Sequence, residues 1–130
     1  MDTQVLIVGG GPVGLTLSLV FAKFGIDCLV IERNASTTTH PKMDVTNSRS
    51  MEIFRLLGVD EQIHAASVPD DICLDVSWVD KLTGHELHRF IYPSPAQARE
   101  NYRALNDGTL STEPDIRISQ ILVEPILRDA

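Results

Sequence analysis

The sequence has little basic charge, few aromatic residues and no long apolar run. Its 130 residues include 11 lysines and arginines against 18 acidic residues, which gives a formal net charge of −7. A chain this acidic, without a basic cluster, is poorly suited to nucleic acid or to an anionic membrane surface. No stretch reaches the roughly 18 apolar residues of a membrane span, and Asp2 stands where a signal peptide has basic residues. We therefore expect no nucleic-acid partner, no membrane span and no signal peptide.

Cysteine is also scarce. Cys28 and Cys73 are far apart in the sequence and form no CxxC pattern. Both fall in stretches expected to be strands, so we expect two reduced thiols in the core of a cytoplasmic protein. The rest of the composition, with 43% apolar and 22% charged residues, is typical of a single globular domain.

The most informative segment joins a run of branched apolar residues, Val5–Val8, to a glycine turn and a helix start. Gly9, Gly11 and Gly14 form a GxGxxG pattern, in which the glycines permit a tight turn, close approach of a pyrophosphate and close helix–strand packing. Pro12 suits the first helical turn, where its missing N–H has no intrahelical partner to lose. The pattern predicts a helix N-terminus that faces the phosphates of a dinucleotide.

The context of this turn supports the same interpretation. A helix over about Pro12 to Phe24 is apolar on almost every side, which predicts burial between layers. Gly25 is a suitable C′ residue, and Cys28–Ile31 is a second short strand. We expect the two strands to be parallel neighbours, covered on both faces. Glu32 follows the second strand at about the 20-residue spacing at which an acid meets the adenosine ribose.

Helical and loop patterns come next. The polar segment from Asn34 to Pro41 has no periodicity and predicts a loop. A helix is expected over 48–57, capped by Thr46 or Asn47 and ended by Gly58, with further helical turns over 60–66.

Alternating residues then predict an antiparallel hairpin. Its strands are Ile72–Val79 and His85–Phe90, joined by a turn over 80–84. The face expected to be buried consists of Leu74, Val76 and Trp78. His85 and His88 are not expected to bind metal, because three-residue spacing on a strand does not bring side chains together.

The last third is less regular. Residues 93–114 contain three prolines and are expected to be mostly loop, with one short helix over 96–102. A short strand is expected over 116–119 and a helix over 120–129. Pro125 predicts that this helix either kinks there or begins later than Gln120.

Several separate motifs occur in an order that points to one family. They are Val5 to Gly14, Glu32-Arg33, His40-Pro41-Lys42, Val45 to Ile53, and Ser119-Gln120 followed by Leu122 and Glu124 to Leu127. In these motifs the chain resembles the flavin-dependent aromatic hydroxylases, or class A flavoprotein monooxygenases. The resemblance is greatest to the phenol, chlorophenol and hydroxyphenylpropionate hydroxylase branch.

The resemblance implies FAD as cofactor. In this family the glycine loop and the acid hold the ADP half of FAD, an arginine follows the proline of the HP segment, and a glutamine bonds the ribityl chain. Here Lys42 replaces that arginine, and lysine lacks the bidentate fork of a guanidinium. The expected cofactor-binding residues are Gly9, Gly11, Pro12, Val13, Gly14, Glu32, Arg33, Lys42 and Gln120. No catalytic residue and no metal ligand is expected among the 130 residues.

The implied activity is hydroxylation of a phenolic ring, with NAD(P)H reducing the flavin and O2 supplying the oxygen. The implied partners are a small aromatic substrate and O2, and a homo-oligomer is left open. The expected fold is α/β, an incomplete Rossmann-like βαβ FAD-binding fold with an antiparallel hairpin.

Family members are several times longer, so residues 1–130 are expected to be the N-terminal part of a single FAD-binding domain and to be inactive alone. Two alternatives are an NAD(P)-binding dehydrogenase domain and a truncated chain without activity. The HPK and TNSRSME segments and the hairpin argue against the dehydrogenase.

Overall fold

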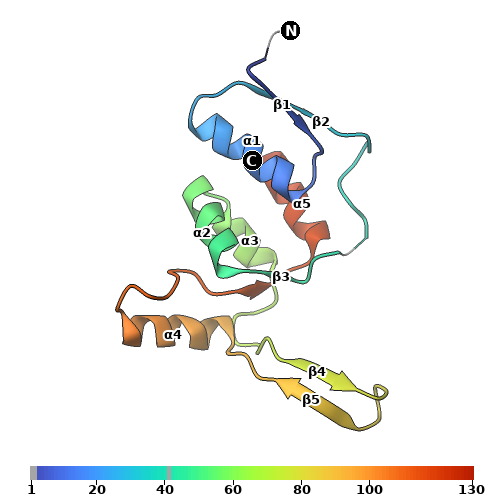
Figure 1. Ribbon diagram of the computed structural model, residues 1–130, viewed down its shortest axis with the longest axis vertical. Coiled ribbons are helices and arrows are strands. Elements are labelled where there is room, and N and C mark those ends of the chain that lie inside the picture. Colours follow the sequence, from blue (N-terminus) through green and yellow to red (C-terminus); the bar gives the residue numbers. More distant parts are fainter. Residues whose placement is uncertain (1–2, 41) are drawn as a thin grey trace.

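Two short parallel strands joined by a helix form the N-terminal unit. The computed structural model describes residues 3–40 and 42–130. Strands β1 (Val5–Val8) and β2 (Cys28–Ile31) pair in parallel, with Val5 opposite Cys28. Helix α1 (Pro12–Lys23) connects them (Figure 1). The predicted pairing of these strands is confirmed.

Helix α1 ends as its sequence predicts. Gly25 has φ +68°, in the left-handed region that glycine occupies without strain. The N–H of Gly25 donates to the carbonyl of Ala22, and that of Ile26 donates to the carbonyl of Phe21. These two bonds form a Schellman motif, which ends the helix and directs the chain into β2.

The remaining elements of the described residues are four helices and four short strands. In chain order they are β3 (Val45–Thr46), α2 (Ser48–Leu57), α3 (Asp60–Ala66), β4 (Val76–Val79), β5 (Glu86–Phe90), α4 (Pro95–Leu105), β6 (Ile116–Arg117) and α5 (Gln120–Asp129).

The predicted helix over 48–57 is confirmed, with Asn47 rather than Thr46 as its cap: the Asn47 side chain accepts from the Ser50 N–H.

The strand expected over 116–119 is shorter, and β6 pairs antiparallel with β3, which the sequence did not indicate. The loop expected over 34–41 has no helix or strand from 34 to 40, and Pro41 lies outside the described residues.

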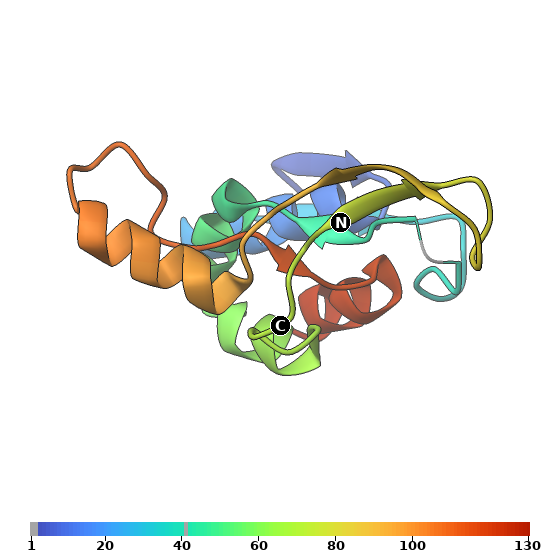
Figure 2. The same cartoon turned by 90° about the horizontal axis from the view of Figure 1, so that it is seen from below.

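The core lies among the helices rather than on the sheet. Helix α1 packs against α5 and β2, and α3 packs against α2 and α5 (Figures 1 and 2). The buried apolar side chains of this cluster are Leu15, Met51, Phe54, Val59, Ile63, Ile116, Ile118, Val123 and Leu127. None of the described helices is long and apolar enough to cross a membrane.

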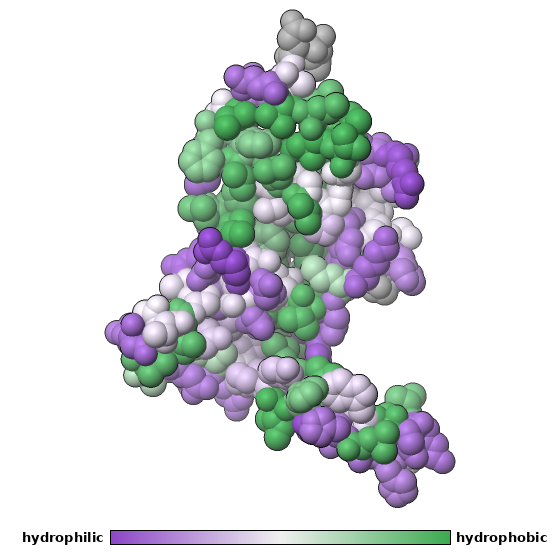
Figure 3. Space-filling view, viewed as in Figure 1, coloured by the Kyte–Doolittle hydropathy of each residue, from purple (hydrophilic) through white to green (hydrophobic). Residues whose placement is uncertain are grey.

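The expectation that β1, β2 and α1 are covered on both sides is wrong. The β1–β2 register places Leu6 beside Leu29 and Val8 beside Ile31, on one face of the sheet. All four are exposed, Val8 to 77%, and in α1 only Leu15 is buried. The physical reason is that α1 and α5 pack on one side only, so apolar side chains remain on the surface over this region (Figure 3).

The hairpin pairs as predicted but is not half-buried. Strands β4 and β5 are antiparallel, with Val76 opposite Phe90. β4 begins at Val76 instead of Ile72, and every residue of both strands is exposed. The hairpin extends away from the helices (Figure 1), so the predicted apolar face has no partner layer. Trp78 packs instead edge-to-face on Phe90, with ring centroids 4.9 Å apart.

The expected pair of core thiols is also corrected. Cys28 is half-buried in β2, but Cys73 is exposed and precedes β4. The reason is the late start of the strand: Leu74 is the buried residue here, and Cys73 lies outside the paired ribbon.

Helix α4 is longer than predicted. It has 11 residues, because Ser94 and Gln97 form a capping box at its start and Pro95 occupies its first turn. Asn106, at φ 41°, ends it in the left-handed region. Helix α5 begins at Gln120 and includes Pro125, which rules out the later start.

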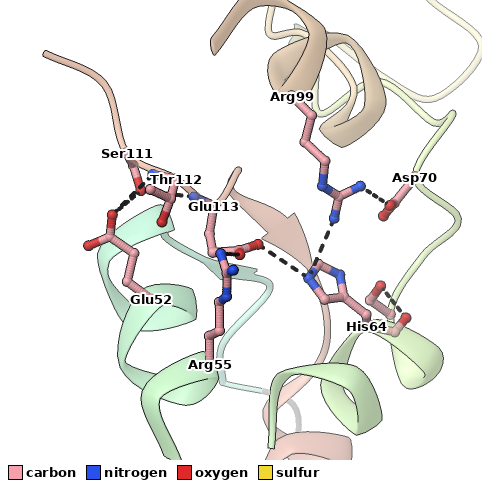
Figure 4. Close-up of polar contacts among 9 residues, drawn as sticks. Glu52, Arg55, His64, Asp70, Arg99, Ser111, Thr112 and Glu113 are labelled. Carbon is pink, nitrogen blue, oxygen red and sulfur yellow. Dashed lines mark hydrogen bonds and ion pairs between the residues drawn. The ribbon is translucent and has the colours of Figure 1, made fainter. Parts of the chain in front are cut away.

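A polar network joins three helices to the segment before β6 (Figure 4). Glu113 is buried and pairs with Arg55 of α2 at 2.9 Å and with His64 of α3 at 3.7 Å. Arg99 of α4 pairs with Asp70 and approaches the His64 ring nitrogen at 3.4 Å. Its two arginines each pair with a carboxylate, Arg55 with Glu113 and Arg99 with Asp70, so the network links α2, α3 and α4.

Candidate cofactor-binding site

The turn between β1 and α1 is built by glycine geometry. Gly9 has φ +111°, and its N–H donates to the carbonyl of Ile31 at 2.8 Å, which extends the pairing of β1 with β2. Gly11 is the N-cap of α1, and no side chain caps this end. The first turn contains Pro12 and no acidic residue. The positive end of the α1 dipole is therefore available to an anion.

Two glycines of the motif have different surroundings. A Cβ on Gly14 would lie 2.0 Å from the carbonyl oxygen of Gly9, so the close approach of α1 to the turn requires glycine there. A Cβ on Gly11 would meet only the Glu124 Oε1 atom, at 4.0 Å. Packing among the described residues therefore does not require glycine at position 11, and the space beside it is open.

Glu32 lies directly after β2, across the turn from α1. Its Oε2 accepts from the Gly10 N–H at 2.7 Å, and its Oε1 accepts from the backbone and side-chain N–H groups of Asn34 at 2.9 and 2.8 Å. Both backbone hydrogen bonds lower the pKa of Glu32, and the one from the Asn34 N–H has a larger effect than the one from the Gly10 N–H. The group is therefore a carboxylate at neutral pH, and about one of its four lone-pair positions remains free.

A pocket of about 640 Å³ opens beside this turn. Its walls are the glycine turn, the end of β2, the 34–39 segment and one face of α5. That face consists of Gln120, Glu124 and Arg128, spaced four residues apart. Charges of both signs line the pocket: Glu32 and Glu124, Lys42 and Arg128.

Four of the predicted site residues meet at this pocket. Gly11, Glu32, Lys42 and Gln120 line it, although they come from distant parts of the sequence. Gly9, Pro12 and Gly14 shape the turn and the helix start beside it. Val13 is 82% exposed and, like Arg33, is not among the lining residues.

Sequence reasoning missed Asn34, Glu124 and Arg128. Asn34 supplies two of the three hydrogen bonds to Glu32. Glu124 is 4% exposed, and its carboxylate accepts from the Thr38 N–H at 2.7 Å and from Gln120 Nε2 at 2.6 Å. Gln120, Glu124 and Arg128 follow one another at four-residue spacing. This spacing could have predicted that the side chains of these three residues share one helix face.

The glycine turn, the acid after β2 and the α5 face match one known domain type. A model of the family described as FAD binding domain matches residues 2–130. The chain belongs to this family. The resemblance to flavin-dependent aromatic hydroxylases is confirmed, together with the α/β FAD-binding fold and FAD as the family's cofactor. The match favours this domain over the NAD(P)-binding alternative.

Two relatives of this FAD-binding domain illustrate the match. The FAD-dependent monooxygenase apdD of Emericella nidulans is 44% identical over 131 residues, which cover 96% of this chain and 20% of apdD. The 2,4-dichlorophenol 6-monooxygenase of Delftia acidovorans is 30% identical over 128 residues, which cover 98% of this chain and 21% of that enzyme. The chain thus spans about a fifth of the length of these curated relatives.

Two solved structures are similar to this chain in fold as well as in sequence. Chromopyrrolic acid-soaked RebC with bound 7-carboxy-K252c has a TM-score of 0.83 at 37% identity, covering 99% of this chain and 24% of the RebC chain. The flavin-dependent monooxygenase PieE in complex with FAD and substrate has a TM-score of 0.82 at 31% identity, covering 99% of this chain and 22% of PieE.

Proposed function

We propose that residues 1–130 are the N-terminal part of a single FAD-binding domain and that they bind the ADP half of FAD. The observation that carries this proposal is the space at Gly11. The N-terminus of α1 has no side-chain cap, and Gly11 opens to the pocket that Glu32 lines from the opposite side. An anionic diphosphate at the helix end and a ribose at the carboxylate fit this arrangement.

The geometry supports the proposed roles of the α1 N-terminus and Glu32, and the family resemblance implies those of Gln120 and Arg33. The N-terminus of α1 binds the diphosphate, with positive charge from Lys42 and Arg128 in the same pocket. Glu32 accepts hydrogen bonds from the ribose hydroxyls, and to hold both it must release the Asn34 side-chain amide. Gln120, on the α5 wall, bonds the ribityl chain. Gly9, Pro12, Val13 and Gly14 form the turn, and Arg33 lies beside the adenosine.

For the whole protein we propose NAD(P)H-dependent hydroxylation of an aromatic substrate with O2, in the cytoplasm. Relatives include a 2,4-dichlorophenol monooxygenase and an aklavinone 12-hydroxylase, both named for aromatic compounds. The bound flavin supplies the redox chemistry, and the residues of this chain bind and orient it. We expect the 130-residue chain to be inactive alone, because it spans only about a fifth of the length of its curated relatives.

The test is titration of the chain and its Glu32→Ala variant with FAD by isothermal calorimetry. Hydrogen bonds to a charged group contribute about 1.5–3 kcal/mol each, so losing Glu32 is expected to weaken binding by at least about tenfold. Glu100→Ala, an exposed glutamate on α4, is the control and should bind FAD like the unmodified chain. Circular dichroism confirms that each variant is folded. Absence of FAD binding by the unmodified chain would contradict the proposal, and unchanged affinity in Glu32→Ala would remove Glu32 from the site.

A further inference from the structure

We propose that Glu124 is a positioning residue of the pocket, which fixes the Gln120 amide and the 34–40 loop for the part of FAD beyond the diphosphate. This inference rests on the proposed function. It concerns a residue that neither the glycine motif nor the ribose acid includes.

The first observation is that Glu124 is a buried acid that forms no ion pair with a lysine or arginine among the described residues. It is 4% exposed, between the core residues Val123 and Leu127 on α5. Burying a carboxylate without hydrogen-bond partners is costly in free energy, so Glu124 depends on the hydrogen bonds that it accepts. Those partners are the Thr38 N–H and Gln120 Nε2.

The second observation concerns the loop. Residues 34–39 contain no helix or strand, yet they form one wall of the pocket. Glu32 holds the loop at Asn34, and Glu124 holds it at Thr38. Two carboxylates, one at each end, thus set the position of this wall.

The third observation concerns the direction of the Gln120 amide. A carboxylate only accepts hydrogen bonds, so Gln120 must turn its NH2 group towards Glu124. In the described part of the chain no donor reaches Gln120 Oε1. Gln120 therefore presents a hydrogen-bond acceptor to the pocket, which suits a hydroxyl-bearing chain.

The fourth observation assigns Glu124 to one end of the pocket. Glu32 contacts Gly10, whereas Glu124 Oε1 lies 4.0 Å from the Cβ position of Gly11. If the ribose of the ADP half lies at Glu32 and the diphosphate at the start of α1, Glu124 and Gln120 lie next to the part of FAD beyond the diphosphate. They should then matter for FAD and not for ADP.

The experiment compares FAD and ADP binding to the 15N-labelled chain by NMR titration. In Glu124→Gln, one accepting oxygen becomes an NH2 group, so the Gln120 amide or the Thr38 N–H loses its partner. We expect FAD affinity to fall by about tenfold and ADP affinity to change by less than about twofold. Glu113→Gln is the matched control, since Glu113 is also a buried glutamate, 8% exposed, but lies outside this pocket. Its FAD and ADP affinities should stay unchanged.

A second measurement needs no variant. The side-chain amide signals of Gln120 in the unmodified chain should shift on addition of FAD and stay in place with ADP. This readout applies even if Glu124→Gln fails to fold.

The outcomes separate this inference from the proposed function. If the unmodified chain binds neither FAD nor ADP, the proposed function fails and this inference fails with it. If it binds both, and Glu124→Gln weakens both equally or neither, the positioning role is overturned while the proposed function stands. Gln120 amide signals that respond equally to ADP and FAD would also overturn it.

Discussion

At the scale of single residues, two glycines three positions apart have different surroundings, and we expect them to matter for different reasons. Gly14 lies against the backbone of Gly9, where a Cβ would come within 2.0 Å of the carbonyl oxygen. Gly11 borders an open pocket, where a Cβ would meet no atom of the chain closer than 4.0 Å. We therefore expect Gly14 to be required for packing and Gly11 to be required for the proposed binding of FAD.

Alanine at these two positions should separate the requirements. Gly14→Ala is expected to destabilise the fold by about 1–3 kcal/mol, because the clash with backbone outweighs the gain in helix propensity. Gly11→Ala should destabilise the fold by less than about 1 kcal/mol, as expected for alanine at an N-cap, but should bind FAD more weakly, because its methyl group would project into the proposed cofactor space. Urea unfolding followed by circular dichroism, with FAD titration of each variant, measures both effects. A stable Gly14→Ala, or full FAD affinity in Gly11→Ala, would contradict the assignment.

Glu52 is expected to stabilise the fold in a way that depends on pH. The Ser111 hydroxyl, which has the largest effect, and Arg49 both donate hydrogen bonds to the Glu52 carboxylate. These bonds lower the pKa of Glu52 from 4.5 to about 2. A carboxyl group with a lowered pKa stabilises the folded state above pH 4.5, and this contribution is lost as the pH falls towards 2. The free energy of unfolding should therefore decrease over this range, and decrease less in Glu52→Gln. Equal pH dependence of the two proteins in urea unfolding would show that Glu52 is not responsible.

At the scale of elements, the capping box of α4 offers a direct test. The Ser94 hydroxyl accepts from the Gln97 N–H, and the Gln97 side chain accepts from the Ser94 N–H. Loss of such a cap costs about 1 kcal/mol, so Ser94→Ala should lower the stability by that amount. Ser36→Ala, at an exposed loop position, should change it by less than about 0.5 kcal/mol. Thermal unfolding of both variants makes the comparison, and equal stability would mean that the cap is not formed.

The sequence predicts those elements whose signals are local. Gly25 ends α1 and Asn47 starts α2 through short-range hydrogen bonds, and both are in place. The hairpin shows the limit: alternation predicts which side chains share a face, but not whether another layer covers that face. The same limit explains why α1 was expected to be buried on all sides. In α4 the short helix over 96–102 was predicted but its full length was not, although the Ser94–Gln97 capping pair is a local signal.

The residues of the candidate site also divide into those whose place the local sequence predicts and those whose place it does not. The glycine turn and Glu32 belong to one βαβ unit, so their closeness follows from a known local geometry. Glu124 and Arg128 reach the pocket only because α5 packs against α1, a contact between opposite ends of the chain. No periodicity within α5 identifies the helix against which it will pack.

At the scale of the whole molecule, the uncovered sheet face predicts binding of apolar dyes. Leu6, Val8, Leu29 and Ile31 form one exposed apolar face, a kind of surface that soluble domains rarely leave open without a partner. The chain should bind anilinonaphthalene sulfonate in its native state and associate more at higher concentration.

Val8→Asp is the matched test of this surface. Val8 is 77% exposed, so the substitution should leave the circular dichroism unchanged while reducing dye fluorescence and association. Sedimentation velocity over a range of concentrations measures the association. Dye binding and association that are unaffected by Val8→Asp would place the responsible surface elsewhere.

The contact between α1 and α5 also sets the order in which the protein can assemble. A ribosome releases the glycine turn and β2 early and α5 late, and the bond from Thr38 to Glu124 spans 86 residues. Contacts of such long sequence separation form slowly, because a large loop must close first. During synthesis the glycine turn therefore exists for some time without the α5 wall of the pocket. If the pocket binds FAD as proposed, we expect the cofactor to be captured after α5 has docked.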